Sequence, residues 1–196
     1  MNRPAFFSAL SAHFGPLDAG QVHGLDFLLD RLEADPPECL EQAAYLLATI
    51  KHETADTYAP VREACFLKVK DPETWRRKNL CYWPWYGRGF VQITWRKNYE
   101  RLGRVLGVDL TTDPDAALEP TTAYRILLRG MVEGLFTGAR LRDCVRPGHV
   151  NYRGARRVVN GADKAALIAE YAKHFETALR SAHYAIANPQ PAEVPA

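Results

Sequence analysis

The chain has 196 residues, an ordinary hydrophobic fraction of 47% and a net charge of +2. This length suits one domain, and the small net charge argues against a dedicated nucleic-acid-binding protein. No apolar run reaches the roughly 20 residues that cross a bilayer, so we expect no membrane insertion. The N-terminal residues lack a continuous apolar segment and a cleavage site, which predicts synthesis in the cytoplasm without a classical signal peptide.

The first part of the chain is predicted to be helical. Apolar residues at helical spacing predict one helix over residues 3–14 and another over residues 25–32. A third helix is predicted from about residue 37 to residue 53, with Leu46 and Ile50 on its apolar face. Turn-forming residues and a proline follow it, so this helix should end where the chain becomes polar.

Residues 56–95 are predicted to form a lobe of loops with a small sheet, because their periodicity is weak. Trp83 and Trp85 could be exposed for stacking on sugar rings, or could form a small aromatic core under a long loop. The sequence leaves both interpretations open.

Side chains alternate between Gly87 and Trp95, which predicts a short strand. One face would turn toward the core, and its residues are Val91, Ile93 and Trp95. The other face would form the polar wall of a cleft, and its residues are Phe90, Gln92 and Thr94.

The second half of the chain is predicted to be mostly helical, over residues 96–106, 121–136, 152–159 and 163–186. Asp163 is expected to cap the last helix, with Leu167 facing inward. The proline-rich residues 188–196 are predicted to be a disordered tail. The predicted fold class is mainly α, a single lysozyme-like domain over residues 1–187 with a small β-sheet or hairpin lining a cleft.

Two carboxylates are the strongest candidates for catalysis. Glu53 stands where the third predicted helix reaches the surface, and a half-desolvated carboxyl there could retain its proton near neutral pH. Glu63 follows ten residues later on a different segment. A pair of carboxylates held apart by a helix and a loop is what glycosidic bond cleavage requires. Glu63 could instead pair with Arg62, and Glu73 is the competing second carboxylate.

Two familiar motifs begin here but are incomplete. His52 and Glu53 open the HExxH zinc motif, but Asp56 stands where its second histidine belongs, so we predict no metal and no cofactor. The glycines at 87 and 89 suggest a dinucleotide-binding loop, but Gln92 replaces its third glycine.

Three blocks of the sequence resemble a known family. They are HETADTYAPVRE, YGRGFVQITWRKNYERLG and ARRVVNG. They resemble glycoside hydrolase family 19 of the lysozyme-like superfamily, most closely its bacteriophage endolysin branch and more distantly the plant-type chitinases. The resemblance covers roughly residues 40–180, and it departs from the chitinase pattern between the first two blocks.

The resemblance implies a role for each matching residue. Glu53 would be the general acid, Glu63 the base that activates water, and Thr94 a catalytic residue that places that water. Substrate would contact Gln92 and Asn98, with Arg157 and Asn160 lining the far side of the cleft. We add His52 and Tyr86, which lie within the same blocks, to the predicted substrate-binding residues.

The resulting hypothesis is a monomeric, inverting glycosidase that cleaves β-1,4 bonds in peptidoglycan and so acts on the bacterial cell wall. Two alternatives remain: a chitinase that acts on chitin, and a non-catalytic wall-binding module of the same fold. The sequence leaves open whether the setting is phage lysis, a virion-borne enzyme or a delivered toxin, and whether an inhibitor exists. Six arginines in the C-terminal half could hold the enzyme near an anionic wall, or could simply be a solvated basic surface.

Overall fold

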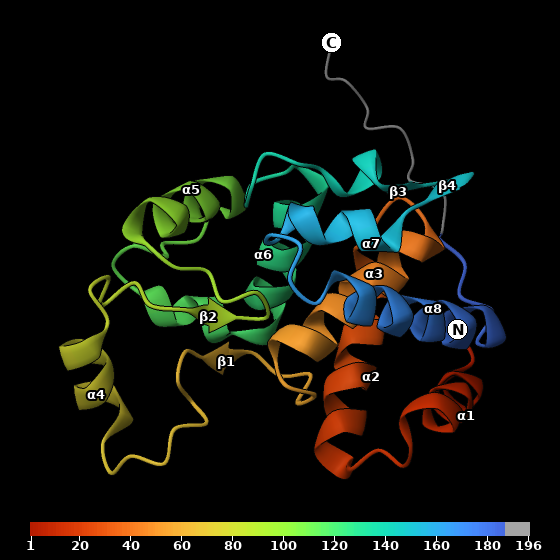
Figure 1. Ribbon diagram of the computed structural model, residues 1–196, viewed down its shortest axis with the longest axis horizontal. Helices are drawn as coiled ribbons and strands as arrows, with labels where there is room; N and C mark the ends of the chain where they lie inside the picture. The colour runs from red at the N-terminus through yellow and green to blue at the C-terminus, as the bar shows by residue number, and fades with distance from the viewer. Residues whose placement is uncertain (187–196) are drawn as a thin grey trace.

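The computed structural model describes residues 1–186, and the predicted tail at 188–196 lies outside the described residues. The described chain is mainly helical, with two small antiparallel sheets of two strands each (Figure 1). This confirms the predicted fold class. The α-helices are α1 (Arg3–Phe14), α2 (Ala19–Ala34), α3 (Leu40–Glu53), α4 (Pro72–Asn79), α5 (Arg96–Leu106), α6 (Pro120–Val132), α7 (Tyr152–Ala155) and α8 (Ala165–Ser181). The strands are β1 (Val61–Arg62), β2 (Arg88–Gly89), β3 (Val145–Arg146) and β4 (His149–Val150), and the 3-10 helices are η1 (Pro114–Leu118), η2 (Leu141–Asp143) and η3 (Arg156–Val158).

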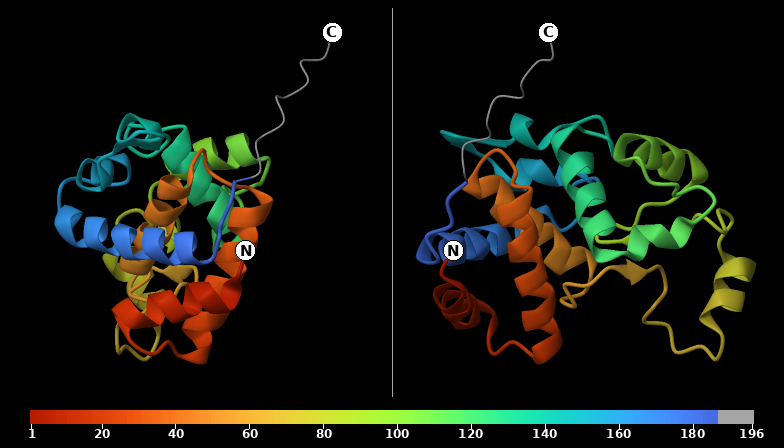
Figure 2. Two further views of the ribbon diagram at one scale, coloured as in Figure 1. Left: turned by 90° about the vertical axis from the view of Figure 1, so that its right-hand side faces the viewer. Right: turned by 180° about the vertical axis from the view of Figure 1, so that it is seen from behind.

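Helix α3 is the centre of the core. Every residue from Gln42 to Lys51 is buried, including polar ones, so this helix is covered on all sides. Helix α8 packs along α3 and also contacts α1, and Figure 2 shows it lying across the molecule beside both. A helix covered in this way emerges only at its end, which is where Glu53 lies.

The helices predicted for the N-terminal part are confirmed, although α2 begins earlier than expected. Asp18 caps α2 and forms a capping box with Gln21. This pairing stabilises the six helical residues that precede the predicted start at residue 25. Gly107 ends α5 in the left-handed conformation with φ 67°, as its position predicts.

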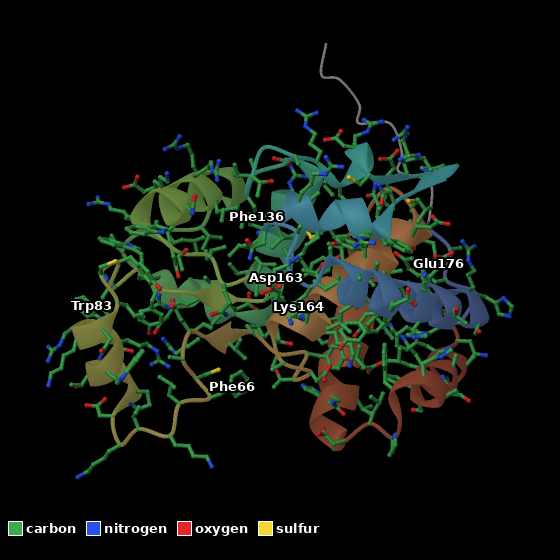
Figure 3. All side chains as sticks on the ribbon, viewed as in Figure 1. Phe66, Trp83, Phe136, Asp163, Lys164 and Glu176 are labelled. Carbon is green, nitrogen blue, oxygen red and sulfur yellow. The ribbon has the colours of Figure 1, made fainter. Side chains whose placement is uncertain are left out.

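A smaller lobe lies to one side of the helical body and contains β1, α4, β2 and α5 (Figure 1). Strand β1 pairs with β2, with Val61 opposite Gly89. Phe66 and Trp83 project from this lobe (Figure 3) and are 63% and 41% exposed. Trp85 instead packs against the core. Trp83 is therefore exposed, as one interpretation of the sequence expects, and Trp85 is packed, as the other expects.

The predicted strand from Gly87 to Trp95 is wrong beyond its first residues. The strand β2 is only two residues long, and the chain then turns, with φ 52° at Gln92 and 70° at Trp95. Val91 and Ile93 are buried, as predicted, but the residues at the two ends of the segment differ from the expected faces. Phe90 is buried with 1% exposure, whereas Trp95, predicted to lie in the core, is 49% exposed.

Helices α6 and α8 also differ from the prediction. Helix α6 ends at Val132 instead of residue 136, because the chain turns back and the Phe136 ring fills the space beside Gly130. Asp163 does not cap α8: Lys164 is the N-cap residue, without a side-chain cap. Leu167, predicted to face inward, is 41% exposed.

Candidate functional site

Glu53 is the last residue of α3, and its side chain is 18% exposed. The guanidinium of Arg156 donates a hydrogen bond of 2.6 Å from Nη1 to Glu53 Oε1. Among the described residues, Oε2 of Glu53 accepts no hydrogen bond from a protein group. One oxygen of this carboxyl is therefore fixed by a cation, while the other remains available.

Arg156 contacts Glu53 but is not among the site residues predicted from the sequence. It is 3% exposed, and its Nε also donates to the Asp163 carbonyl at 3.1 Å. It therefore joins the end of α3 to the loop before α8, where Figure 3 labels Asp163 and Lys164. Tyr152, four residues earlier, is buried and gives a signal: helical spacing puts Arg156 on the same inward face.

The two residues predicted to line the far side of the cleft lie at the surface. Arg157 is exposed, and its Nε donates to the carbonyl of Gly154 at 3.0 Å. Asn160 is also exposed, and its side chain accepts a hydrogen bond from the N–H of Gly161. The structure therefore brings the neighbouring arginine, Arg156, to Glu53 and leaves both predicted residues facing solvent.

Glu63 follows directly after β1 and is held through both carboxylate oxygens. Tyr82 donates its hydroxyl to Oε1 at 2.6 Å, and the N–H of Gly87 donates to Oε2 at 2.7 Å. The hydrogen bond to Glu63 raises the pKa of Tyr82 to about 12, with burial adding to it. The hydroxyl of Tyr82 therefore stays protonated and keeps donating over the whole working pH range.

The GRGFVQIT block packs against Glu63. A Cβ on Gly87 would lie 2.7 Å from Gln92 Oε1 and 3.1 Å from Glu63 Oε2, so only glycine fits between these two side chains. Gln92 donates its Nε2 to the carbonyls of Val61 at 2.8 Å and Gly89 at 3.2 Å. The amide thus stabilises the β1–β2 connection while its oxygen faces the carboxylate.

The remaining predicted residues lie beside this block. Thr94 is half-buried, and its carbonyl accepts a hydrogen bond of 2.7 Å from Asn98 Nδ2 at the start of α5. His52 is half-buried in the last turn of α3, directly before Glu53. The side-chain donor of Asn98 is therefore already used within the fold.

Tyr86 and Glu73 form a separate polar network. Tyr86 is 1% exposed, and its hydroxyl donates to Glu73 Oε2 at 2.9 Å and accepts from Arg62 at the same distance. Any role of Tyr86 toward a substrate is therefore indirect. Burial raises the pKa of Glu73, but hydrogen bonds from Trp83, Tyr86 and Arg76 outweigh it and lower that pKa below its ordinary value.

A groove of about 730 Å³ lies beside α5, and neither Glu53 nor Glu63 lines it. The ring of Tyr82, which binds Glu63, lies 5.0 Å from the ring of Trp95, which lines the groove. On the other wall, the hydroxyl of Thr137 donates to the carbonyl of Arg157, next to the arginine that binds Glu53. The groove is therefore linked to each carboxylate only through intervening residues.

Within the described residues, no group of three or more His, Cys, Asp and Glu side chains could hold a metal ion. No helix in this part of the chain is long and apolar enough to cross a membrane.

Comparisons with known proteins find similarity to one family of glycoside hydrolases. Residues 38–129 match the family model Glyco_hydro_19, described as chitinase class I. Endochitinase A2 of Pisum sativum is 33% identical over 100 residues, which are 45% of this chain and 31% of the pea protein. An endochitinase of Phaseolus vulgaris is 35% identical over 86 residues, 38% of this chain and 26% of the bean protein. The matches therefore span about a third or less of the length of these relatives.

The fold is also similar to that of a solved structure. The crystal structure of chitinase C from Streptomyces griseus HUT6037 superposes with a TM-score of 0.58 and 20% sequence identity. The superposition covers 90% of this chain and 76% of that chain. At this identity the comparison shows a shared fold, and it confirms that the predicted mixture of helices and small sheets is a chitinase-like arrangement.

Proposed function

We propose that this chain, whose residues 38–129 match the glycoside hydrolase family 19 model described as chitinase class I, hydrolyses β-1,4 bonds in an amino-sugar polymer. The observation that supports this most is the pair of differently held carboxylates, Glu53 and Glu63. Glu53 is fixed on one oxygen by Arg156 and open on the other, whereas Glu63 is fixed on both by neutral donors. Two carboxyls in unlike environments suit one acid and one base.

In the proposed reaction, Glu53 protonates the leaving glycosidic oxygen from Oε2. As the proton leaves, negative charge develops on the Glu53 carboxylate, and Arg156 already lies where it stabilises that charge. Because a carboxylate oxygen has more than one lone pair, Glu63 can accept its two hydrogen bonds and still take a proton from water. Attack by that water from the opposite face of the sugar inverts the anomeric carbon.

Two polymers, chitin and peptidoglycan, are candidates for the substrate. The names of the matched relatives, which are endochitinases, support chitin. Peptidoglycan, the substrate predicted from the endolysin-like blocks, is supported by a basic surface, because chitin is neutral while the bacterial wall is anionic. The exposed arginines of this surface are Arg140, Arg142, Arg146, Arg153 and Arg157. If peptidoglycan is the substrate, the protein acts on the bacterial wall in an endolysin-type setting.

The test uses wild-type protein and the Glu53→Gln variant on chitin hexamer and on purified peptidoglycan. Since general acid catalysis contributes about 10²–10⁴-fold, we expect at least a hundredfold loss of product formation on whichever polymer is cleaved. Glu170→Gln is the matched control, because Glu170 is also ion-paired, with Lys173, but lies on the exposed face of α8. Activity of Glu53→Gln within a few-fold of the control would refute the proposed acid. Binding without cleavage by wild-type protein would indicate a wall-binding module.

A further inference from the structure

The groove beside α5 carries a charge pattern that the proposed reaction does not need. Its lining side chains are aromatic, amide, hydroxyl and cationic: Trp95, Lys97, Asn98, Arg101, Phe136 and Thr137. No acidic residue lines it among the residues that the structure describes. Its volume of about 730 Å³ is within the range of small-molecule sites.

The two cations of the groove are placed together by the helix. Lys97 and Arg101 are four residues apart on α5, so their side chains share one face. Like charges at this spacing repel each other, and an anion between them would relieve the repulsion. Neither side chain forms an ion pair with any residue in the described part of the chain.

Arg101 is held in position across the groove. Its Nη2 donates to Asn98 Oδ1 at 3.2 Å and also to the carbonyl of Leu135 on the opposite wall. A guanidinium has five N–H donors, so several remain for a ligand after these contacts. Lys97 is exposed and, among the described residues, its ammonium group has no hydrogen-bond acceptor.

The aromatic part of the groove suits a sugar ring. Trp95 is 49% exposed although its ring lies 5.0 Å from that of Tyr82, so one side of the indole is supported and another is open to solvent. The indole ring is flat and mostly apolar, with one polar N–H, and such a ring is suited to contact with the face of a sugar. The labelled Phe136 contributes a second, half-buried ring from the loop after α6 (Figure 3).

We propose that the α5 groove is a subsite for an amino sugar that carries a carboxylate. Trp95 contacts the sugar ring, and Lys97 and Arg101 bind the carboxylate. The inference rests on the proposed function, and it selects between the two polymers, because chitin offers no group for these cations. A glycan strand in which alternate sugars bear a lactyl carboxylate, as in peptidoglycan, offers one at every second unit.

The test isolates the charge by using two ligands of the same length. One is a hexasaccharide of alternating N-acetylglucosamine and N-acetylmuramic acid, and the other is the same chain with its lactyl groups converted to neutral amides. Binding of both is measured by titration calorimetry with the Glu53→Gln protein, which prevents hydrolysis. Since an exposed ion pair contributes up to about fivefold in affinity, two pairs should favour the acid ligand by about tenfold at low salt. The preference should shrink as salt rises.

Lys97→Gln should reduce the preference for the acid ligand by about threefold, and Lys97→Arg should retain it. Lys78→Gln is the control, because it removes the same charge from an exposed position on α4. Equal affinity for the acid and amide ligands in the parent protein would overturn the proposal. So would an equal effect of Lys97→Gln and Lys78→Gln, because only the net charge would then matter.

The two proposals fail separately. If the acid ligand is preferred through Lys97 but wild-type protein cleaves neither polymer, the subsite stands and the hydrolase does not. If wild-type protein cleaves a polymer through Glu53 but does not distinguish the acid from the amide ligand, the hydrolase stands and the subsite does not. A Trp95→Ala variant should weaken both ligands equally, because the ring contact does not depend on charge.

Discussion

Replacement of Arg156 by glutamine should weaken both the fold and the proposed reaction. The side chain of Arg156 is 4% exposed and that of its partner Glu53 is 18% exposed, so the pair is mostly shielded from water. Removing one member of a buried ion pair costs about 3–5 kcal/mol. Because water can still reach Glu53, we expect the lower end, about 3 kcal/mol, including the lost hydrogen bond to the Asp163 carbonyl.

A loss of that size is easily measured by thermal unfolding. In a chain of this length, 1 kcal/mol shifts the melting temperature by about 2–4 °C, so Arg156→Gln should melt about 6–12 °C below wild type. The Glu53→Gln variant and the double variant complete a thermodynamic cycle. A coupling free energy of about 2 kcal/mol between the two positions would show that the ion pair itself, and not the size of either side chain, is responsible.

The catalytic effect should exceed what the lost stability explains. At a temperature where Arg156→Gln is fully folded, its kcat should fall by about 10²-fold, because a donor aimed at developing negative charge is gone. Arg156→Lys keeps the positive charge, but its single nitrogen does not reproduce the separate hydrogen bonds that Arg156 makes to Glu53 and to the Asp163 carbonyl. This variant should therefore recover only part of the rate. The rate is measured on the polymer that wild-type protein cleaves, across the pH range in which both proteins remain folded.

Two results would contradict this reasoning. Coupling near zero in the cycle would mean that the contact between Arg156 and Glu53 contributes nothing. If Arg157→Gln lost activity while Arg156→Gln kept it, the functional arginine would be Arg157, as the resemblance implies. The role assigned here to Arg156 would then be refuted.

The other predictions concern the second carboxylate and the small lobe. Glu63→Gln should remove most turnover and flatten the acid limb of the pH–rate curve, whereas Glu73→Gln should remain active; the opposite result would exchange their roles. Asp115→Asn should lower the free energy of unfolding by about 2 kcal/mol at neutral pH, because it leaves the buried Arg88 without its carboxylate. The hydrogen bond from Arg62 lowers the pKa of Asp115, so this stabilisation is complete above the unfolded pKa of about 3.9 and disappears as the pH falls through the folded value. Denaturant unfolding at several pH values measures it, and a difference that persists in strong acid would contradict it.

The sequence predicts the helices well where apolar residues recur at helical spacing. Helix α3 is the clearest case, because its apolar spacing and the polar residues after it place Glu53 at its end, as observed. The resemblance predicts candidate residues for the site, but not their contacts. Arg156 and Arg157 are neighbours of the same type, and only the packing of α7 against α8 decides which one is buried.

The segment after β2 could not be predicted from local pattern. Alternation of apolar and polar residues between Gly87 and Trp95 imitates a strand, but the left-handed conformation of Gln92 depends on a bond that its side chain makes to Val61, thirty-one residues away. A positive φ at a residue other than glycine is unfavourable, so the conformation needs such distant contacts. Local preference alone gives no sign of them.

This geometry changes what the GRGFVQ block means for the site. The N–H of Gly87 donates a hydrogen bond to Glu63, and the space around Gly87 admits no side chain. The side-chain amide of Gln92 donates to backbone carbonyls of β1 and β2. Both residues therefore position Glu63 before any substrate arrives. It follows that a change at either position should act as a loss of Glu63 function, lowering kcat more than substrate affinity. A residue that only touches the sugar would show the reverse.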